Sequence, residues 1–289
     1  MKIELIAAFL LLAGISSMAA AQEKKNSKFH FLTFNCEESE REEMTADATP
    51  QSPPLEVDDP GTPGCNAWEI NLTFSGDMAK DEKEYELPLL DMNYGVGDNL
   101  QLKYEVPFLL KDSNEGDESG FGNSKFGVKW QFREDEENGL DMALYPQIEF
   151  ANPGSNSVDK GIAERGTLFS MPLLVTKGVG GIGGKEVTLT GNVGYNWING
   201  SSAPDFVNVS LGAGIPLSNK LAVMCDLVGE YSLSDNPETE KYDRLLKGEL
   251  AVMMPLGNVL TAYGTIGRSL YTSENEDHTY FVLGLRASL

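Results

Sequence analysis

The 289-residue chain has few of the residues that most often carry catalytic and metal chemistry. It contains only two histidines, His30 and His278, and three cysteines. Three cysteines permit at most one disulfide within a chain. After the amino terminus, no stretch approaches the ~18 consecutive apolar residues that a transmembrane helix requires. We therefore expect no metal site, no cofactor and no helical membrane protein.

Basic side chains are also scarce. The sequence has 22 lysines and arginines against 44 aspartates and glutamates, which gives a formal net charge of -22. Proteins that bind nucleic acids neutralise phosphates with basic side chains, so we do not expect a nucleic-acid partner. The mean hydropathy of -0.25 is too low for a bundle of membrane helices. A β-barrel with a wet interior and polar loops can be this polar.

The amino terminus has the three parts of a secretory signal peptide. Lys2 supplies a positive charge, Leu5–Ile15 is apolar, and Ala19–Ala21 offers a cleavage site of small residues before Gln22. The apolar stretch is too short to span a membrane. We therefore predict that residues 1–21 are a signal peptide. The exported chain is then bound for a bacterial outer membrane or, as an alternative, is secreted.

From Trp68 to Leu289 one pattern recurs, with apolar and polar residues alternating over extended runs. Clear samples are Trp68–Phe74, Leu100–Val106 and Phe126–Phe132. Alternation with a period of two places all apolar side chains on one face of a strand. Strands of ~9–11 residues are long enough to cross a bilayer at a tilt, whereas strands of soluble sandwiches usually have ~5–6 residues. The pattern predicts an all-β fold, a single transmembrane antiparallel up-and-down β-barrel.

We predict about twelve strands in this barrel, within a range of about 10–14, because single-chain bacterial barrels have an even number. The predicted spans are 66–76, 84–95, 99–109, 121–134, 139–151, 165–177, 186–198, 205–216, 219–233, 243–254, 258–271 and 278–289. Tight turns at 95–99, 217–220 and 255–258 alternate with longer acidic segments at 111–119, 152–164, 234–242 and 272–277. Short periplasmic turns opposite long outer loops are typical of such barrels, which places both termini in the periplasm. A soluble β-fold is the less favoured alternative.

A different kind of segment, residues 22–65, precedes the predicted barrel domain at 66–289. It contains the acidic run Glu37–Glu43 and the proline-rich stretch Pro50–Pro63. Such a composition has little apolar surface to bury, which favours an irregular, solvated periplasmic arm. The alternative is a small plug inside the lumen, and the apolar stretch Phe29–Phe34 could dock there. Cys36 and Cys65 flank most of this segment and could form a disulfide in an oxidising periplasm.

Three stretches of the sequence resemble a known family. They are Asp58–Gly64 followed by Trp68–Asn71, then Leu89–Phe108 with its Val-Pro-Phe ending, and Gly120–Gly127, where Asn123 replaces an acid. These stretches are similar to a family of bacterial outer-membrane transporters of the type named for the MetA pathway of phenol degradation. The resemblance extends over most of residues 58–289 and implies a small outer-membrane barrel that passes apolar or aromatic compounds.

The alternation also assigns the two faces of the sheet. The apolar set faces lipid and includes Leu102, Tyr104, Val106, Phe108, Phe126, Val128, Trp130, Phe132, Val193, Tyr195 and Trp197. The polar set faces inward, and the predicted pore-lining residues are Lys103, Glu105, Lys125, Lys129, Arg133, Glu149, Asp226, Glu230, Lys247, Glu249 and Arg286. One interpretation places the basic and acidic members on opposed walls of an open bore. The other is that the charges pair and hold the lumen shut.

The sequence does not indicate an enzyme. A Ser-His-acid hydrolase would need a serine beside a strand histidine, and we expect Ser269 and Ser288 to lie at different depths from His278. The glycine-rich stretch Gly178–Gly183 is followed by a strand pattern rather than a helix, so it is expected to be a flexible turn and not a dinucleotide-binding loop. Cys225 alternates with Val223 and Leu227 and should face lipid.

Two functions remain open. The first is a passive outer-membrane channel for a small organic solute, aromatic or amphipathic. The second is a non-transporting surface protein whose acidic loops bind divalent ions, lipopolysaccharide or a protein partner. In both cases the chain contacts outer-membrane lipid and lipopolysaccharide. The lumen charges distinguish the two functions, because only a channel should change its selectivity when they are replaced.

Overall fold

The computed structural model describes residues 45–80, 82–113, 116–135, 139–153, 155–234, 244–273 and 277–289. The predicted signal peptide, the acidic run 37–43, His30 and Cys36 lie outside the described residues. Within these ranges, the chain has no helix that is both long and apolar enough to cross a membrane.

The described chain is built from β-segments. Their bounds are β1 Trp68–Met78, β2 Glu82–Gly95, β3 Leu100–Ser113, β4 Gly116–Phe121, β5 Asn123–Arg133, β6 Leu140–Leu144, β7 Gln147–Ala151, β8 Thr167–Ile182, β9 Lys185–Asn199, β10 Phe206–Ser218, β11 Leu221–Ser232, β12 Arg244–Pro255, β13 Leu260–Thr272 and β14 Thr279–Ser288. β4 and β5 continue one another across Gly122, and β6 and β7 continue one another across Tyr145 and Pro146. Pro146 has no N–H to donate to a sheet, which is a physical reason for the second interruption. The segments therefore make twelve barrel strands.

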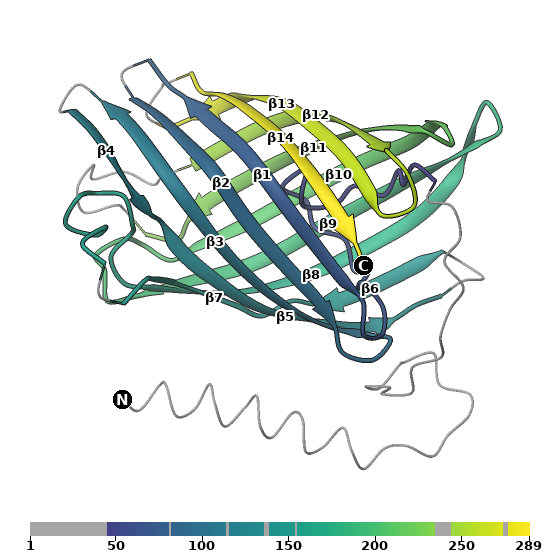
Figure 1. Ribbon diagram of the computed structural model, residues 1–289, viewed down its shortest axis with the longest axis horizontal. Helices are drawn as coiled ribbons and strands as arrows, with labels where there is room; N and C mark the ends of the chain where they lie inside the picture. The colour runs from purple at the N-terminus through teal and green to yellow at the C-terminus, as the bar shows by residue number, and fades with distance from the viewer. Residues whose placement is uncertain are drawn as a thin grey trace, which may run out of the picture.

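Each barrel strand pairs antiparallel with the next one along the chain, and β1 pairs with β14 to close the sheet (Figure 1). The closing pair runs from Glu69 opposite Ser288 to Met78 opposite Thr279. Closure satisfies the backbone hydrogen bonds of every strand and leaves no free edge, as a strand that crosses lipid requires. The predicted twelve-stranded up-and-down barrel is confirmed.

Two predicted connectors are wrong. The glycine-rich stretch Gly178–Gly183 is not a flexible turn, because β8 extends to Ile182 and β9 begins at Lys185. The turn itself is Gly183-Gly184, and both residues have positive φ angles (63° and 81°), as a tight two-residue hairpin turn requires. The acidic stretch 111–119 is not a long loop either, because β3 reaches Ser113 and β4 starts at Gly116.

The alternation of side chains between the two faces follows the prediction. On β12, the outward residues Leu250 and Val252 are 61% and 48% exposed, whereas the inward Ala251 is 2% exposed. Tyr104, Phe126, Val193 and Tyr195 are likewise exposed on the outer surface, and Cys225 lies among the outward residues of β11. An apolar exterior of this kind suits contact with lipid.

The barrel has two different ends. At one end, which we name the turn end, lie the junctions β2–β3, β5–β6, β8–β9, β10–β11 and β12–β13, and the carboxyl terminus lies there too. At the other end, which we name the loop end, lie the junctions β1–β2, β3–β4, β7–β8, β9–β10, β11–β12 and β13–β14. The turn end corresponds to the predicted periplasmic side, and that orientation stays a prediction.

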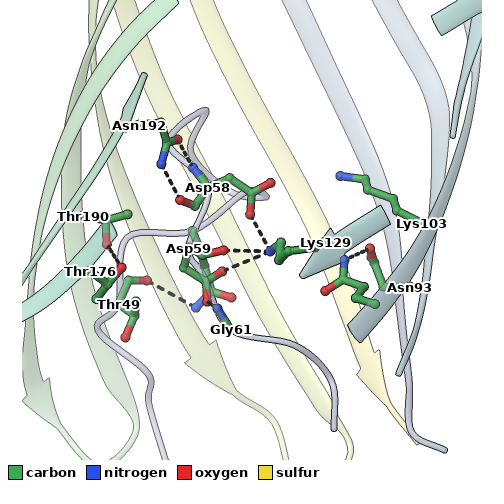
Figure 2. A network of polar contacts seen from close by, with 12 residues as sticks. Thr49, Asp58, Asp59, Gly61, Asn93, Lys103, Lys129, Thr176, Thr190 and Asn192 are labelled. Atoms are coloured by element: carbon green, nitrogen blue, oxygen red, sulfur yellow. Dashed lines mark hydrogen bonds and ion pairs between the residues drawn. The ribbon is translucent and has the colours of Figure 1, made fainter. Parts of the chain in front are cut away.

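Residues 45–66, which we name the lumen segment, run inside the barrel (Figures 1 and 2). The segment contains no strand or helix. Its Ala46, Ala48, Leu55 and Val57 pack against inward residues of β11, β12 and β13 in one buried apolar cluster, whose wall members are Ala222, Met224, Ala251, Met253 and Tyr263. Fully burying an aliphatic side chain contributes about 1.5–3 kcal/mol, so this small cluster can hold the segment only together with polar contacts.

Candidate functional site

Lys129 joins the wall of the barrel to the lumen segment. It lies on the inward face of β5 and is 3% exposed. Its Nζ donates to Asp58 Oδ1 and to the backbone oxygen of Asp59, both at 2.8 Å (Figure 2). The same Nζ lies 5.0 Å from the centroid of the Tyr145 ring. A buried lysine needs such partners, because an unpaired charge in a dehydrated site is costly.

A second strand of the wall, β9, holds the same point of the segment through an uncharged side chain. Asn192 on β9 accepts the N–H of Asp58 at 2.7 Å and donates to the Asp58 backbone oxygen at 2.7 Å (Figure 2). Ser210 on β10 donates to the same Asn192 oxygen at 3.1 Å. Asp58 therefore links β5 and β9 inside the lumen, with its carboxylate bound to β5 and its backbone bound to β9.

Arg286 holds the part of the segment near Pro53. It lies inward on β14, and its Nη2 donates to the backbone oxygen of Pro53 at 2.6 Å. Its other nitrogens contact Gln51 and donate to Asn71 Oδ1 at 3.0 Å. The planar guanidinium has five donors in a fixed arrangement, so one arginine can contact both the wall and the segment.

The third anchor lies on β11, β12 and β13. Asp226 Oδ2 accepts the backbone N–H groups of Glu56 and Val57, both at 3.1 Å. Lys247 contacts the Glu56 carboxylate, and Thr265 Oγ1 donates to the backbone oxygen of Pro54 at 2.8 Å. Each of these wall residues thus satisfies a polar group that the irregular segment cannot pair within itself.

Two inward glycines of β10 give the segment the space that it occupies. A Cβ atom at Gly214 would lie 1.8 Å from the backbone oxygen of Ala48, and one at Gly212 would lie 2.7 Å from Val57 Cγ1. Both distances are shorter than van der Waals contact, so any side chain larger than hydrogen at these positions would collide with the segment.

The other predicted pore-lining residues pair along the wall. Lys125 lies 3.1 Å from Glu105 and 4.0 Å from Glu149. Lys103 contacts Glu105 and lies 3.7 Å from Asp91. Basic and acidic residues therefore alternate on one wall, and the predicted separation of charge onto opposed walls is wrong. The strand register explains this, because Glu105 and Lys125 are direct cross-strand partners.

The remaining predicted residues lie at different levels. Arg133 is near the turn end and pairs with Asp135 at 2.8 Å. Glu230 lies towards the loop end, where it lines a cavity of about 400 Å³ with Tyr280 and other residues. Glu249 is 5% exposed beside Lys247, at 3.6 Å. All eleven predicted residues are on strands of the barrel.

Asp59 is a group of the segment whose protonation is perturbed. The pKa of its carboxyl is raised to about 6, mainly because the group is buried and in part because of the neighbouring Asp58 carboxylate, while Lys129 acts in the opposite direction. Asp59 Oδ2 also accepts the N–H of Gly61 at 2.8 Å. The seated segment therefore binds a proton at Asp59 more tightly than the same residue would in water.

The segment divides the lumen. A cavity of about 330 Å³ lies towards the turn end and is lined by Asp59, Lys103, Tyr145 and other residues. A cavity of about 530 Å³ lies towards the loop end and is lined by Glu86, Lys111 and others. Ser52 of the segment lines both cavities. Both volumes are in the range of small-molecule sites.

The loop-end cavity is closed in part by the connector 152–166. Ser157, Ile162 and Ala163 of this connector are at most 6% exposed. A Cβ atom at Gly120 would lie 3.0 Å from Ser157 Oγ and 3.6 Å from Ile162 Cγ2, so the connector packs against β4. Ile162 also lines the cavity. The sequence predicted a long outer loop at 152–164, and the structure places three of its residues in buried positions.

Several residues of the site were missed at the level of the sequence. Asn192, Asn71, Asn93 and Gln101 are uncharged, and the prediction selected only charged inward residues. The alternation could have identified Asn192. Val193 and Tyr195 were assigned to the outer face, and the residue before Val193 therefore points inward. The contacts of Asp58 with Lys129 had no signal, because 71 positions separate the two residues and the segment has no periodic pattern.

His278 has an acidic partner and an adjacent serine. Its Nδ1 lies 2.9 Å from Asp77 Oδ1, and its backbone N–H donates to Ser269 Oγ at 2.8 Å. The expectation that Ser269 lies at a different depth is wrong, because β13 and β14 pair at this level. The Ser269 hydroxyl oxygen is engaged by the backbone, and the imidazole faces Asp77 instead of this serine.

In the described part of the chain, no group of three or more His, Cys, Asp or Glu side chains is placed to hold a metal ion. Cys225 is a free cysteine. The predicted Cys36–Cys65 disulfide stays a prediction, because Cys36 lies outside the described residues.

Solved structures of outer-membrane proteins share this fold. The chain is similar to the COG4313 outer membrane channel from Pseudomonas putida F1, with a TM-score of 0.59 and 15% identity over 77% of this chain and 94% of that one. It is also similar to the NanC porin, with a TM-score of 0.54 and 7% identity over 76% of this chain and 100% of that one. At these identities the likeness concerns the fold alone.

No family model matches the sequence, and no curated protein matches it. The resemblance to the phenol-degradation family therefore stays an expectation from the sequence motifs.

Proposed function

We propose that the chain is an outer-membrane channel for a small organic solute and that the lumen segment is its plug. The observation that carries the proposal is the combination of an apolar barrel exterior with a polar lumen, which residues 45–66 divide into separate cavities. A structural protein of the membrane has no need for buried lysines and carboxylates inside its barrel, because these groups are costly to dehydrate.

The size of the barrel supports a channel for single small solutes. Twelve strands enclose more space than the ~8 strands of a barrel filled by side chains and less than the ~16–18 strands of general porins. The solved channels and porins with this fold agree with such a role. In this proposal, residues 1–21 direct export, the turn end faces the periplasm and the loop end faces outward.

The way in which the segment is attached supports a movable plug. Its carboxyl-terminal end continues into β1, where Trp68 pairs with Leu289. The other contacts with the barrel are side-chain hydrogen bonds, one small apolar cluster and two backbone hydrogen bonds near the ends of the segment. In these, Ala46 N–H donates to Asn219 O at 2.9 Å and Asn66 N–H donates to Gly95 O at 3.0 Å. The segment contributes no strand to the sheet, so it can leave the lumen while every strand pairing of the barrel stays intact.

The lining of the loop-end cavity supports an amphipathic solute. Leu89, Leu109 and Ile162 provide apolar surface, while Glu86 and Lys111 provide charge in the same cavity. Sites for small molecules usually combine apolar walls with a few polar groups that fix orientation. The solute itself is proposed only as a class, a small aromatic or amphipathic organic compound.

Reconstitution of the full mature protein tests the proposal. In planar bilayers and swelling liposomes, the wild type should conduct in brief openings, and Lys129→Met, which weakens the plug, should conduct for longer. The same liposomes should admit phenylalanine faster than arabinose if the solute class is right. A barrel that stays tight in both proteins would contradict the channel and leave the non-transporting surface protein as the remaining function.

A further inference from the structure

Asp226 and Glu249 form a carboxyl pair directly beneath the plug. They are cross-strand partners on β11 and β12, and both point into the lumen with exposures of only 4% and 5%. Asp226 is also the residue that accepts the backbone N–H groups of Glu56 and Val57. The pair is therefore covered by the segment itself.

One oxygen of each carboxyl group lacks a donor. Asp226 Oδ1 and Glu249 Oε2 are buried and have no hydrogen-bond partner within the described residues, yet the two side chains lie within hydrogen-bond range of each other. Ionised carboxylate oxygens only accept hydrogen bonds. Two such groups in contact, away from water, are stable when they share one proton, because adjacent like charges cannot both be present at low cost.

Four strands and the lumen segment surround the pair. β10 and β13 face the pair with Gly212 and Gly267, which carry no charge. The titratable and charged groups nearby are Lys247 on β12, Glu56 on the segment, Glu230 on β11 and Tyr280 on β14, with Asp77, Glu84 and Glu86 lining the adjoining cavity. Lys247 is the cation among these described groups, and it already contacts Glu56 and Glu249.

We propose that Asp226 and Glu249 share one proton while the plug is seated, and that loss of this proton releases the plug. The inference rests on the proposed function of residues 45–66 as a plug. Its physical basis is the thermodynamic linkage between proton binding by the pair and the position of the segment. The seated segment keeps water from the pair and so strengthens the hold on the shared proton, whereas water admitted by a departing segment can solvate two carboxylates. A rise in pH therefore favours the vacated lumen.

Two isosteric variants separate this proton from other titrations. In Glu249→Gln, the amide can donate permanently to Asp226 Oδ1, and in Asp226→Asn the amide can donate to Glu249 Oε2 while its oxygen still accepts from the segment. Linkage to one proton changes the ratio of vacated to seated plug by up to about tenfold per pH unit. Both variants should lose this part of the pH dependence, and the control Glu230→Gln should keep it.

The first measurement is the exposure of Glu56. Cleavage of the full mature protein at this residue by a glutamyl endopeptidase is compared between wild type and variants at each pH between about 5 and 9. The comparison at equal pH cancels the pH dependence of the protease and the titration of Asp59. We expect cleavage of the wild type to rise more steeply with pH than cleavage of Glu249→Gln and Asp226→Asn. Equal slopes in wild type and both variants would overturn the proposal.

The second measurement does not depend on transport. Infrared difference spectra of wild type against each variant should contain the C=O band of a protonated carboxyl group at neutral pH, and the same band should be missing from both variants. Absence of this band from the wild type would overturn the shared proton. If no protein conducts, the channel fails as a function, while the infrared and cleavage results still decide whether the pair controls the segment.

Discussion

The Nζ atom of Lys129 lies 2.8 Å from Asp58 Oδ1, so that a strand residue buried in the barrel wall is paired with an aspartate from an irregular segment 71 positions earlier in the chain. The pair joins the two parts of the molecule that the sequence pattern treats separately. If the segment is a plug, this contact is one of the interactions that keep it seated.

The first prediction concerns Lys129→Met. The variant leaves the carboxylates of Asp58 and Asp59 without their cation in a dehydrated site, whereas a departing segment returns them to water. The seated state should lose about 2–3 kcal/mol, which corresponds to a roughly 30- to 150-fold rise in the ratio of open to closed channels. Single-channel recording in planar bilayers measures this ratio.

Lys125→Met is the matched control for that experiment. Lys125 lies on the same strand and the same face, but its partners Glu105 and Glu149 belong to the wall. This variant should alter ion selectivity and leave the ratio of open to closed channels near the wild-type value. Equal opening in the two variants would show that lumen charge in general, and not the contact with the segment, controls conduction.

The second prediction concerns Gly214→Ala. The added Cβ atom would overlap the backbone oxygen of Ala48, and overpacking of this kind typically costs about 1–3 kcal/mol. Residues 46–50 should therefore leave the wall, and amide hydrogen exchange of this stretch should accelerate while the strands stay protected. In the control Gly191→Ala, the nearest atom to the new Cβ is 3.6 Å away, so exchange should not change. Unchanged exchange in Gly214→Ala would mean that the segment is not held at this place.

The third prediction concerns pH and Asp59. Burial raises the pKa of this carboxyl from 3.8 to about 6, so the seated segment binds the proton more tightly than the released one. The contribution of Asp59 therefore stabilises the seated state as pH falls from 7 towards 3.8, and it is lost as pH rises through about 6. Between pH 7 and pH 5 it amounts to about 1.3 kcal/mol, or roughly a tenfold change in the open-to-closed ratio.

Asp59→Asn tests this assignment. The amide cannot titrate, so the roughly tenfold change in the open-to-closed ratio that Asp59 contributes between pH 5 and pH 7 should be absent from the variant. Recording both proteins at the same two pH values isolates the effect. If, relative to the variant, the open-to-closed ratio of the wild type were larger at pH 5 than at pH 7, the predicted sign would be reversed.

The fourth prediction tests the outer face. Leu250 is 61% exposed on the outward side of β12, and an arginine near the midplane of a lipid bilayer costs about 2–4 kcal/mol. Leu250→Arg should therefore fold into lipid vesicles less stably by that amount, whereas Leu250→Ala should lose much less. Urea titration of folding, followed by tryptophan fluorescence, measures the difference. Equal stability of the arginine and alanine variants would place this face in water.

The sequence was sufficient for the barrel because its signals are local and repeated. The alternation in Phe126–Phe132 assigns both faces of one strand without reference to any other part of the chain. Once every strand pairs with the next one along the chain, pairing of the first strand with the last closes the barrel. The prediction ended one strand at residue 177, although β8 extends to Ile182. The stretch Gly178–Ile182 is rich in glycine, which has no side chain to show alternation. The prediction also missed the strand ends at Ser113 and Gly116, where the residues on both faces are polar.

The site was less predictable for a different reason. The inward position of Lys129 follows from the alternation, but its partner does not, because Asp58 lies in a segment without period or regular structure. Asp226 and Glu249 were recognised as inward acids, and their register on β11 and β12 made them neighbours. That the backbone of Glu56 and Val57 would cover them depends on long-range packing, and no pattern in a single sequence reports such contacts.

The most direct test of the central claim is to lock the plug. A Cβ atom at Gly212 would lie 2.7 Å from Val57 Cγ1, so cysteines at these two positions are close enough to form a disulfide. In the variant Val57→Cys/Gly212→Cys, with each single cysteine variant as control, single-channel conductance is recorded before and after reduction. We predict a silent channel when the new disulfide is formed and conduction once it is reduced; the same conductance in both states would contradict a lumen closed by its own segment.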